Sequence, residues 1–383
     1  LLQTPDTLTL ERALERARAT RPQLQAAQAL TAGARARVGI AGTIPNPILT
    51  FKHSETSPIE DASISQPLDW LLTRGANRAA ARAGLLGAEA DSALIAAQVG
   101  YEVRVAFYTS LAASESWRLV AAQAATADSL VAFAAERVRA GDISVLEREQ
   151  FEVEAGRVFQ LGLRSYEARL AAAISLRRVL GGAITTLVPV GRLDRGLDIT
   201  LPIGDQGLGS PLLQRAVADS AAQRALSQAS ALRRIPFPSL MLGREWDADG
   251  PFANGSRAVI GFSIPVPIWN IGTGPASLAR AQVDQAAANL AETRLELSRQ
   301  VADAELRLGT ARSRAVFTRD SLLPRAQRLR DGAVRLYRAG QTGVIPLFDA
   351  LRAEREVAIG YIDDLLAWQR ALADWLLLLG RSE

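Results

Sequence analysis

The sequence contains no cysteine and a single histidine, His53. Without cysteine the chain forms no disulfide, thiolate nucleophile or cysteine-based metal site. One histidine removes paired-histidine metal centres and disfavours a Ser-His-Asp triad. We therefore expect no metal site, no cofactor and no enzyme activity, and we expect His53 to be an ordinary loop or strand residue.

Long apolar runs are also missing. No stretch of about 18 consecutive apolar residues occurs, so the sequence predicts no transmembrane helix. Only 5% of the 383 residues are aromatic although 48% are hydrophobic, and much of that share is Ala and Leu. This composition favours helices in close side-by-side contact over one thick globular core.

Charge is dispersed along the chain. The 44 basic residues, all arginine except Lys52, are interspersed with 40 acidic ones, for a net charge of +4. A nucleic-acid-binding protein would show a one-sided basic patch, so we predict no nucleic-acid partner. The chain starts at Leu1 rather than Met, and we expect a mature or trimmed form whose signal peptide or acylated cysteine would precede it.

The sequence does contain an internal repeat. Arg139-Ala140-Gly141-Asp142 recurs 199 positions later as Arg338-Ala339-Gly340-Gln341. Each block closes one long stretch rich in Ala, Leu and Arg and opens another, which indicates an internal duplication. We predict a first repeat at residues 1–182, an equatorial linker at 183–211 and a second repeat at 212–383. Each repeat contains a helix, a β-hairpin (about 46–68 and 239–265), a long helix (about 73–139 and 275–338) and a return helix (about 142–180 and 342–380).

Prolines and glycines mark the limits of these elements. One helix is expected over residues 8–38, before Pro45 and Pro47 forbid its continuation. The first long helix has no proline, and at 1.5 Å per residue its roughly 65 residues span about 100 Å. Pro324 lies inside the second long helix and predicts a local irregularity. Alternation of apolar and polar residues predicts strands at 48–53, 62–68, 239–246 and 257–265, with a further short strand considered at 185–190.

The helices carry a 3.5-residue apolar pattern. In the last helix only Arg355 and Gln369 interrupt the run, whose members are Val344, Phe348, Leu351, Ala358, Ile362, Leu365, Leu372, Leu376 and Leu379. A similar run in the second long helix extends from Val283 to Ala315. Such spacing predicts coiled-coil packing, and a large soluble helical bundle also satisfies it.

The hairpins distinguish these two interpretations. Strands of seven to ten residues have the length of tilted membrane strands. A sheet of four strands has open edges, whose backbone N–H and C=O groups would find no hydrogen-bond partner in lipid. Several copies must therefore combine their strands into one closed barrel, and three copies give twelve strands. Trp70, Trp246 and Trp269 stand at strand ends, where aromatic rings mark the headgroup level, although each could equally serve packing. Helices of about 100 Å are amphipathic and belong in water, so the pattern indicates a barrel continued by a helical tube, which is a duct.

Near the end of the sequence, Leu336-Tyr337-x-x-Gly340 is followed by Leu347-Phe348-Asp349-Ala350. These segments resemble the Tyr-x-x-Gly turn and the Leu-Asp-Ala run of the TolC family of outer-membrane efflux and secretion channels. The segments Leu323-Pro324-x-Ala326, Arg21-Pro22-x-Leu24 and Asn46-Pro47 resemble further family motifs, in the right order over nearly the whole chain. Gly141-Asp142-Ile143-Ser144 is similar to the first turn of the branch that serves metal-cation and drug efflux.

The resemblance implies a mainly α fold with a small β part. It implies a homotrimer with a twelve-stranded barrel in the outer-membrane lipid of a Gram-negative-type cell, and a coiled-coil tunnel in the periplasm. Transport would be passive and gated by opening of the helical tip. The implied partners are a periplasmic adaptor and an inner-membrane pump of the RND or ABC type.

The resemblance also assigns residues to the tip. Six would contact the adaptor: Ala140, Gly141, Asp142, Ala339, Gly340 and Gln341. Asp349 matches an acidic ring that constricts the pore, while the family's second acidic position is Pro346 here. Tyr337 matches a tyrosine that holds the closed state, and its counterpart in the first repeat is Val138. Three carboxylates converging on an axis would attract cations, although Asp349 could also be an ordinary solvated side chain, and Asp142 could be a second acidic group or a helix cap.

Two alternatives stay open. The chain could be a protein-secretion duct of the same family, or, in a different class, a soluble periplasmic coiled-coil scaffold or adaptor. Adaptors carry one helical hairpin with β-rich domains, whereas this sequence predicts two hairpins and no such domains.

Overall fold

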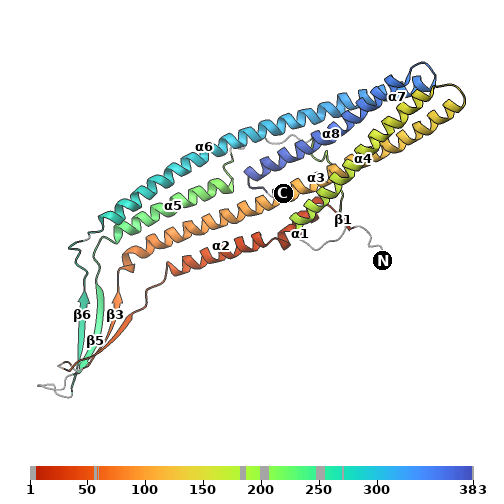
Figure 1. The fold of residues 1–383 in the computed structure, drawn as a ribbon. Coiled ribbons are helices and arrows are strands. Elements are labelled where there is room, and N and C mark those ends of the chain that lie inside the picture. The colour runs from red at the N-terminus through yellow and green to blue at the C-terminus, as the bar shows by residue number, and fades with distance from the viewer. Residues whose placement is uncertain are drawn as a thin grey trace, which may run out of the picture. The chain divides into compact units, whose positions relative to one another are not determined.

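A computed structural model describes residues 6–55, 58, 60–181, 187–198, 207–246, 255–269 and 271–381 (Figure 1). The fold is mainly helical with a small sheet. In chain order its elements are β1 (Asp6–Leu8), α1 (Leu10–Thr20), α2 (Pro22–Ile40), β2 (Ile48–His53), β3 (Glu60–Pro67), α3 (Trp70–Arg139), α4 (Val145–Leu180), β4 (Leu187–Pro189), α5 (Pro211–Leu232), β5 (Ser239–Trp246), β6 (Ser256–Ser263), α6 (Thr273–Phe317), the π-helical turn η1 (Thr318–Leu322), α7 (Leu323–Arg338) and α8 (Val344–Leu378).

The prediction of one N-terminal helix over residues 8–38 is wrong. The structure has two helices, α1 and α2, that meet at Arg21 and Pro22. Arg21 has an extended backbone (ψ 115°), because the ring of Pro22 disfavours helical geometry in the residue before it. Pro22 in turn occupies the first position of α2, where its missing N–H costs nothing.

The irregularity predicted at Pro324 is confirmed, and it takes the form of a π-helical turn. Residues 318–322 form η1, in which the Leu323 N–H donates to the Thr318 carbonyl five residues earlier. Pro324 has no N–H to return to Asp320, so the α-helical pattern cannot pass through this point unchanged. The extra residue of the π turn accommodates the missing hydrogen bond, and the chain continues directly as α7.

The four longer strands form one antiparallel sheet with the order β2-β3-β5-β6. The two β-hairpins are joined by pairing of β3 with β5, so that Ile64 lies opposite Leu242. Register places most of the apolar side chains of the four strands on one face: Leu49, Phe51, Ala62, Ile64, Leu240, Leu242, Trp246, Ala258, Ile260 and Phe262. The same face also carries His53, Glu60, Gln66 and Arg244. The other face is mostly small or polar: Thr50, Lys52, Asp61, Ser63, Ser65, Gly243, Glu245, Arg257 and Gly261.

The further short strand expected at residues 185–190 is present in its described part as β4 (Leu187–Pro189). It pairs in parallel with β1, a strand that the sequence pattern did not predict. Residues 185 and 186 lie outside the described residues.

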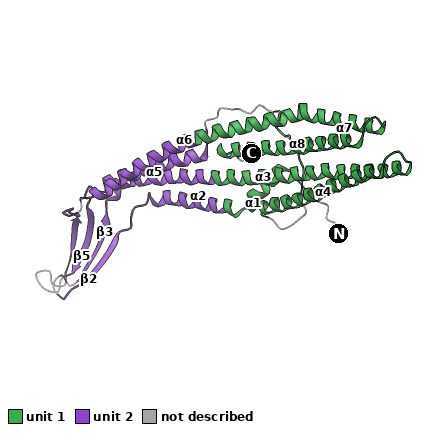
Figure 2. Ribbon diagram, turned by 45° about the horizontal axis from the view of Figure 1, so that its top comes forward, with its two compact units in different colours: residues 1–24, 94–208, 297–383 green, residues 25–93, 209–296 purple. Residues whose placement is uncertain are grey.

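The chain divides into two compact units, each of which draws segments from both halves of the sequence (Figure 2). One unit comprises residues 25–93 and 209–296 and includes the four-stranded sheet. The other comprises residues 1–24, 94–208 and 297–383, and it contains the main hydrophobic core around Phe107, Leu176 and Trp368.

The predicted apolar seams are buried where they lie in this unit, which Figure 2 draws as unit 1. In the other unit the predicted α6 seam is not buried, since Ala287 and Arg294 are exposed. Leu297, Val301, Ala304, Leu308, Ala311 and Ala315 of α6 are all buried, at alternating spacings of four and three. Along α8 every seam position from Val344 to Leu379 is buried or half-buried. Gln369, one of the two polar interruptions, is 3% exposed and donates from Nε2 to the Leu193 carbonyl at 2.7 Å.

Candidate functional site

The two repeated blocks form the same helix-ending turn. After α3, Gly141 adopts a left-handed backbone (φ +78°), while Gly141 N–H donates to the Val138 carbonyl and Asp142 N–H to the Arg137 carbonyl. After α7, Gly340 (φ +70°) and Gln341 make the equivalent bonds to Tyr337 and Leu336. This is the Schellman motif, which satisfies the last carbonyls of a helix and prefers glycine at the left-handed position.

The six residues of these two glycine turns, Ala140–Asp142 and Ala339–Gln341, are all exposed. Neither turn carries a bulky apolar side chain, so each presents backbone and small side chains to its surroundings. That surface allows close backbone approach by a partner.

The helix starts after the two turns differ. Ser144 caps α4 by accepting from the Glu147 N–H at 3.1 Å, so the cap is Ser144 rather than Asp142. The Asp142 carboxylate instead lies 3.7 Å from Nε of Arg137. Gly343, at the matching position before α8, offers no side-chain cap. The second turn therefore has the less restrained helix start.

Tyr337 is buried between the two helical hairpins. Its hydroxyl lies 3.2 Å from Oε1 of Glu147, and its ring centroid lies 5.7 Å from that of Phe151, so a side chain of α7 contacts α4 twice. Burial and the nearby Glu147 carboxylate raise the pKa of Tyr337 to about 12. The phenol therefore stays protonated and donates to Glu147 at neutral pH. A small apolar cluster surrounds it: Ala134, Phe151, Val344, Leu347 and Phe348.

Asp349 lies in the first turns of α8 and is largely exposed. Its Oδ1 is 3.9 Å from Nη1 of Arg352, one turn further along the same helix. The structure thus places Asp349 and Asp142 on different hairpins, each beside an arginine of its own hairpin. Both carboxylates are accessible for a role outside the chain's own core.

The three predicted interface tryptophans lie at both ends of the sheet strands. Trp246 ends β5 on the side of the hairpin turns, and Trp70 opens α3 three residues after β3 ends. Trp269 follows β6 and is 93% exposed. Strand direction puts Trp70 and Trp269 at the opposite strand end from Trp246.

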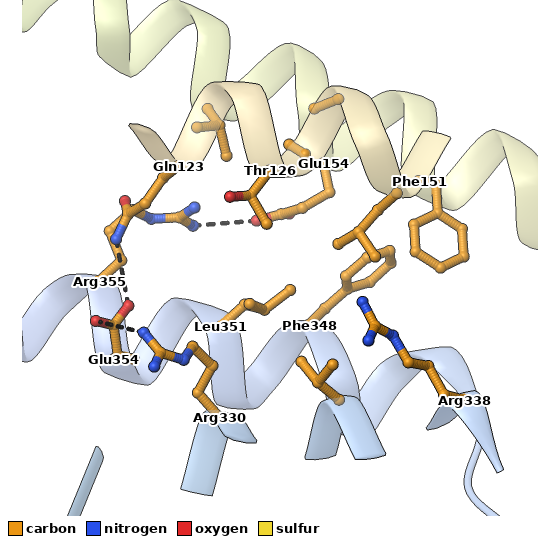
Figure 3. Close-up of a pocket in the computed structure, with 15 residues that line it drawn as sticks. Gln123, Thr126, Phe151, Glu154, Arg330, Arg338, Phe348, Leu351, Glu354 and Arg355 are labelled. Carbon is orange, nitrogen blue, oxygen red and sulfur yellow. Dashed lines mark hydrogen bonds and ion pairs between the residues drawn. The ribbon is translucent and has the colours of Figure 1, made fainter. Parts of the chain in front are cut away.

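Two buried carboxylates escaped sequence reasoning. Glu154 on α4 and Glu354 on α8 are 5% and 6% exposed and line one cavity of about 250 Å³ between α3, α4, α7 and α8 (Figure 3). Arg352 and Arg355 bind Glu154, while Arg330 and Gln123 bind Glu354. The available signal was Arg355, the other polar interruption of the α8 seam, because a charge in an apolar seam needs a buried partner.

These features define a class of protein. A sheet with one mainly apolar and one mainly polar face has the side-chain pattern of transmembrane β-barrel strands, and it is continuous in sequence with long helices. No described helix is long and apolar enough to cross a bilayer by itself. Within the described residues no group of three His, Cys, Asp or Glu side chains is placed to hold a metal ion. The class is that of outer-membrane channels with a helical extension.

Comparison with known proteins finds similarity to outer-membrane efflux proteins. Residues 208–381 match the family described as Outer membrane efflux protein. The cobalt-zinc-cadmium resistance protein CzcC of Cupriavidus metallidurans is 28% identical over 381 residues, which cover 98% of this chain and 90% of CzcC. The C-terminal part of this chain thus matches the outer-membrane efflux proteins, and nearly the whole chain is similar to CzcC. These similarities identify an efflux channel rather than an enzyme.

Solved structures share the fold. CusC superposes with a TM-score of 0.82 at 18% identity, over 97% of this chain and 92% of that one. VceC of Vibrio cholerae gives 0.77 at 18% identity, over 97% and 96% of the two chains. The mainly helical fold with a small sheet is therefore that of known outer-membrane channels.

Proposed function

We propose that three copies of this chain form one exit duct across the outer membrane. The single observation that carries this proposal is the sheet, in which β2 and β6, as far as the described residues go, each pair with one neighbouring strand only. Lipid cannot satisfy such open edges, and an even number of antiparallel strands per copy lets β6 of one copy pair with β2 of the next. Three copies would close a twelve-stranded barrel with its apolar face toward lipid and its polar face toward water.

Exposed apolar side chains on the helices support assembly with further copies. On α4 the stripe comprises Leu146, Val153, Phe159, Leu163, Leu170 and Ile174, and on α6 and α7 it comprises Leu306, Phe317, Leu329 and Leu336. Stripes of this length on a water-exposed helix are unfavourable unless another surface covers them. In a trimer, the α4 stripe of one copy would pack near the α6–α7 stripe of its neighbour.

We divide the chain into two structural repeats, residues 1–182 and 212–383, which arose by duplication and are joined by a linker at 183–211. The matched hydrogen bonds of the two glycine turns support this assignment. In the trimer six such turns would surround the periplasmic mouth, where the small exposed residues from 140 to 142 and from 339 to 341 would receive the hairpin tips of an adaptor. An inner-membrane pump of the RND or ABC type would supply the energy, so transport through the duct is passive.

Gating would occur at this mouth. Tyr337 joins α7 to α4 through Glu147, and separation of the two hairpins must break that contact. Asp349 would form a ring of three carboxylates inside the mouth, with Asp142 as a second acidic group. Trp70, Trp246 and Trp269 would mark the two headgroup levels of the outer membrane.

The cargo we propose is divalent metal cations, since the relative that spans nearly the whole chain is a cobalt, zinc and cadmium resistance protein. A carboxylate ring at the mouth is compatible with cations. Efflux is favoured over protein secretion by the family description, and a channel is favoured over a soluble scaffold by the two-faced sheet.

The decisive experiment combines mass and conductance. Protein purified in detergent should have the mass of three chains and should form cation-selective channels in planar bilayers. Cells that produce the chain with its own adaptor and pump should tolerate more cobalt, zinc or cadmium than cells with a Gly340→Trp variant. A monomer without channel activity would exclude the duct, and raised tolerance to drugs but not metals would exclude the proposed cargo.

A further inference from the structure

The face of α4 that meets the second hairpin is a seam with two acidic positions. Glu147, Phe151, Glu154 and Val158 follow one another at spacings of four, three and four, and therefore lie on one side of the helix. Glu147 meets Tyr337 of α7, whereas Glu154 lies two turns further from the glycine turn, about 10 Å along the axis. Polar contacts thus alternate with apolar ones along this seam.

Glu154 is bound from the other hairpin. Oε2 accepts from Arg352 Nη2 at 2.5 Å, and Oε1 accepts from Arg355 Nη2 at 3.0 Å, so both carboxylate oxygens are fixed by α8. Arg157 of α4 itself lies 3.5 Å away. Burial acts to raise the pKa of the Glu154 carboxyl, but hydrogen bonds from Arg352 and Arg355 outweigh it and lower that pKa. The carboxylate is therefore charged at neutral pH.

Glu354 forms a weaker counterpart at the same end of the cavity. Its carboxylate accepts from Arg330 of α7 and from Gln123 of α3, each at 3.3 Å. In Figure 3 these ion pairs gather at one end of the cavity, while the rings of Phe151 and Phe348 close the other end. Between the two ends the hairpins are separated by open space, so apolar packing alone does not lock them along the full seam.

A charged pair inside an apolar seam selects one register. Apolar side chains tolerate sliding and repacking, whereas a buried carboxylate that leaves its arginine is left without a partner. We propose that Glu154, held by Arg352 and Arg355, is a positioning residue of the gate: it fixes the register of α4 on α8 and keeps the two glycine turns in the closed arrangement. This inference rests on the proposed function, since it requires that the mouth gates transport.

The first test is the isosteric variant Glu154→Gln with Glu152→Gln as its matched control. Glu152 lies on the same helix but is exposed, and among the described residues it pairs with Arg148 at 3.3 Å. Purified trimers in planar bilayers should show a rise of about ten-fold or more in open fraction for Glu154→Gln, and no change for Glu152→Gln. In pump-free cells the same variant should increase vancomycin entry, read as a fall in the inhibitory concentration. Equal behaviour of the two variants would overturn the inference.

A second variant tests whether the Glu154 ion pairs set the register of α4 on α8 or only stabilise the fold. A triple variant replaces the buried ions with apolar side chains: Glu154→Met, Arg352→Met and Arg355→Met. Such a replacement commonly preserves or raises the stability of a protein. A register role predicts stable trimers that still leak, since no polar pair selects the closed alignment. Stable trimers that close normally would overturn the inference, because the ions would then be structural only. This variant also keeps the test informative if Glu154→Gln fails to assemble.

Asp349→Ala in the same assay separates this inference from the proposed function. A changed conductance in Asp349→Ala beside an unchanged Glu154→Gln would reject the register role alone. If neither variant altered conductance or leak, both the register role and the gating mouth would be rejected.

Discussion

The backbone conformation of Gly340 determines whether its replacement by alanine stabilises or destabilises the protein. Its φ of +70° is in the left-handed region, and a Cβ placed there meets no atom within 4 Å. Replacement by alanine therefore costs only the backbone penalty, about 1–2 kcal/mol per chain. In a trimer all three copies pay it, so the helical end should loosen before the rest of the molecule.

Gly332 supplies the matched control for this prediction. It lies within α7, eight residues earlier, and a Cβ there also meets nothing within 4 Å. Its backbone is helical, so Gly332→Ala should stabilise the helix by roughly 0.5–1 kcal/mol. The same chemical change is thus expected to have opposite effects at two positions of one hairpin.

The assay is heat or urea unfolding of purified trimers, followed by helical circular dichroism. Gly340→Ala should lower the midpoint of the helical transition and Gly332→Ala should raise it, while both trimers retain their mass. Shifts in the same direction would refute the argument from backbone conformation. The bulkier Gly340→Trp should additionally abolish adaptor-dependent efflux with intact trimers, and full efflux in that variant would count against adaptor contact at the turn.

Three further predictions concern the gate and the membrane. Asp349→Ala should raise single-channel conductance or change block by divalent cations, and unchanged traces would dismiss the carboxylate ring. The raised pKa of Tyr337, about 12, means that its contribution to stability is complete below about pH 10 and is lost as the pH rises through 12. Tyr337→Phe should remove this alkaline loss from a pH series of melting curves, and a persisting loss would show that another group causes it. On β2, Leu49→Arg should cost about 2–4 kcal/mol in lipid whereas Thr50→Arg should be tolerated, so equal folding yields in vesicles would contradict the assigned faces.

Local signals in the sequence account for most of the elements. The strands at Ile48–His53 and Ser239–Trp246 have the bounds expected from alternation, because a period of two is visible without tertiary information. The irregularity at Pro324 followed from a missing N–H. Pro22 acts differently, because its ring disfavours helical geometry at Arg21. Helical composition on both sides of Pro22 outweighs this signal, so the sequence alone does not predict the split between α1 and α2.

The candidate site was less accessible to such reasoning. The internal repeat predicts the glycine turns, and resemblance to a family motif assigns Tyr337. Neither predicts the partner of Tyr337, since Glu147 lies 190 residues away in sequence. Nothing in the sequence around Glu154 distinguishes it from a solvated helix carboxylate. Its burial against Arg352 became visible only when α4 and α8 were brought together.

The sequence by itself determined the local structure of this protein: long helices, glycine turns at Gly141 and Gly340, and strands with one mainly apolar side. These follow from backbone conformation and side-chain period, which depend on near neighbours only. Tertiary structure alone decided which hairpin faces which and how the strands pair. It also decided which of 40 acidic residues are buried, because desolvation and ion pairing depend on distances between residues far apart in the chain.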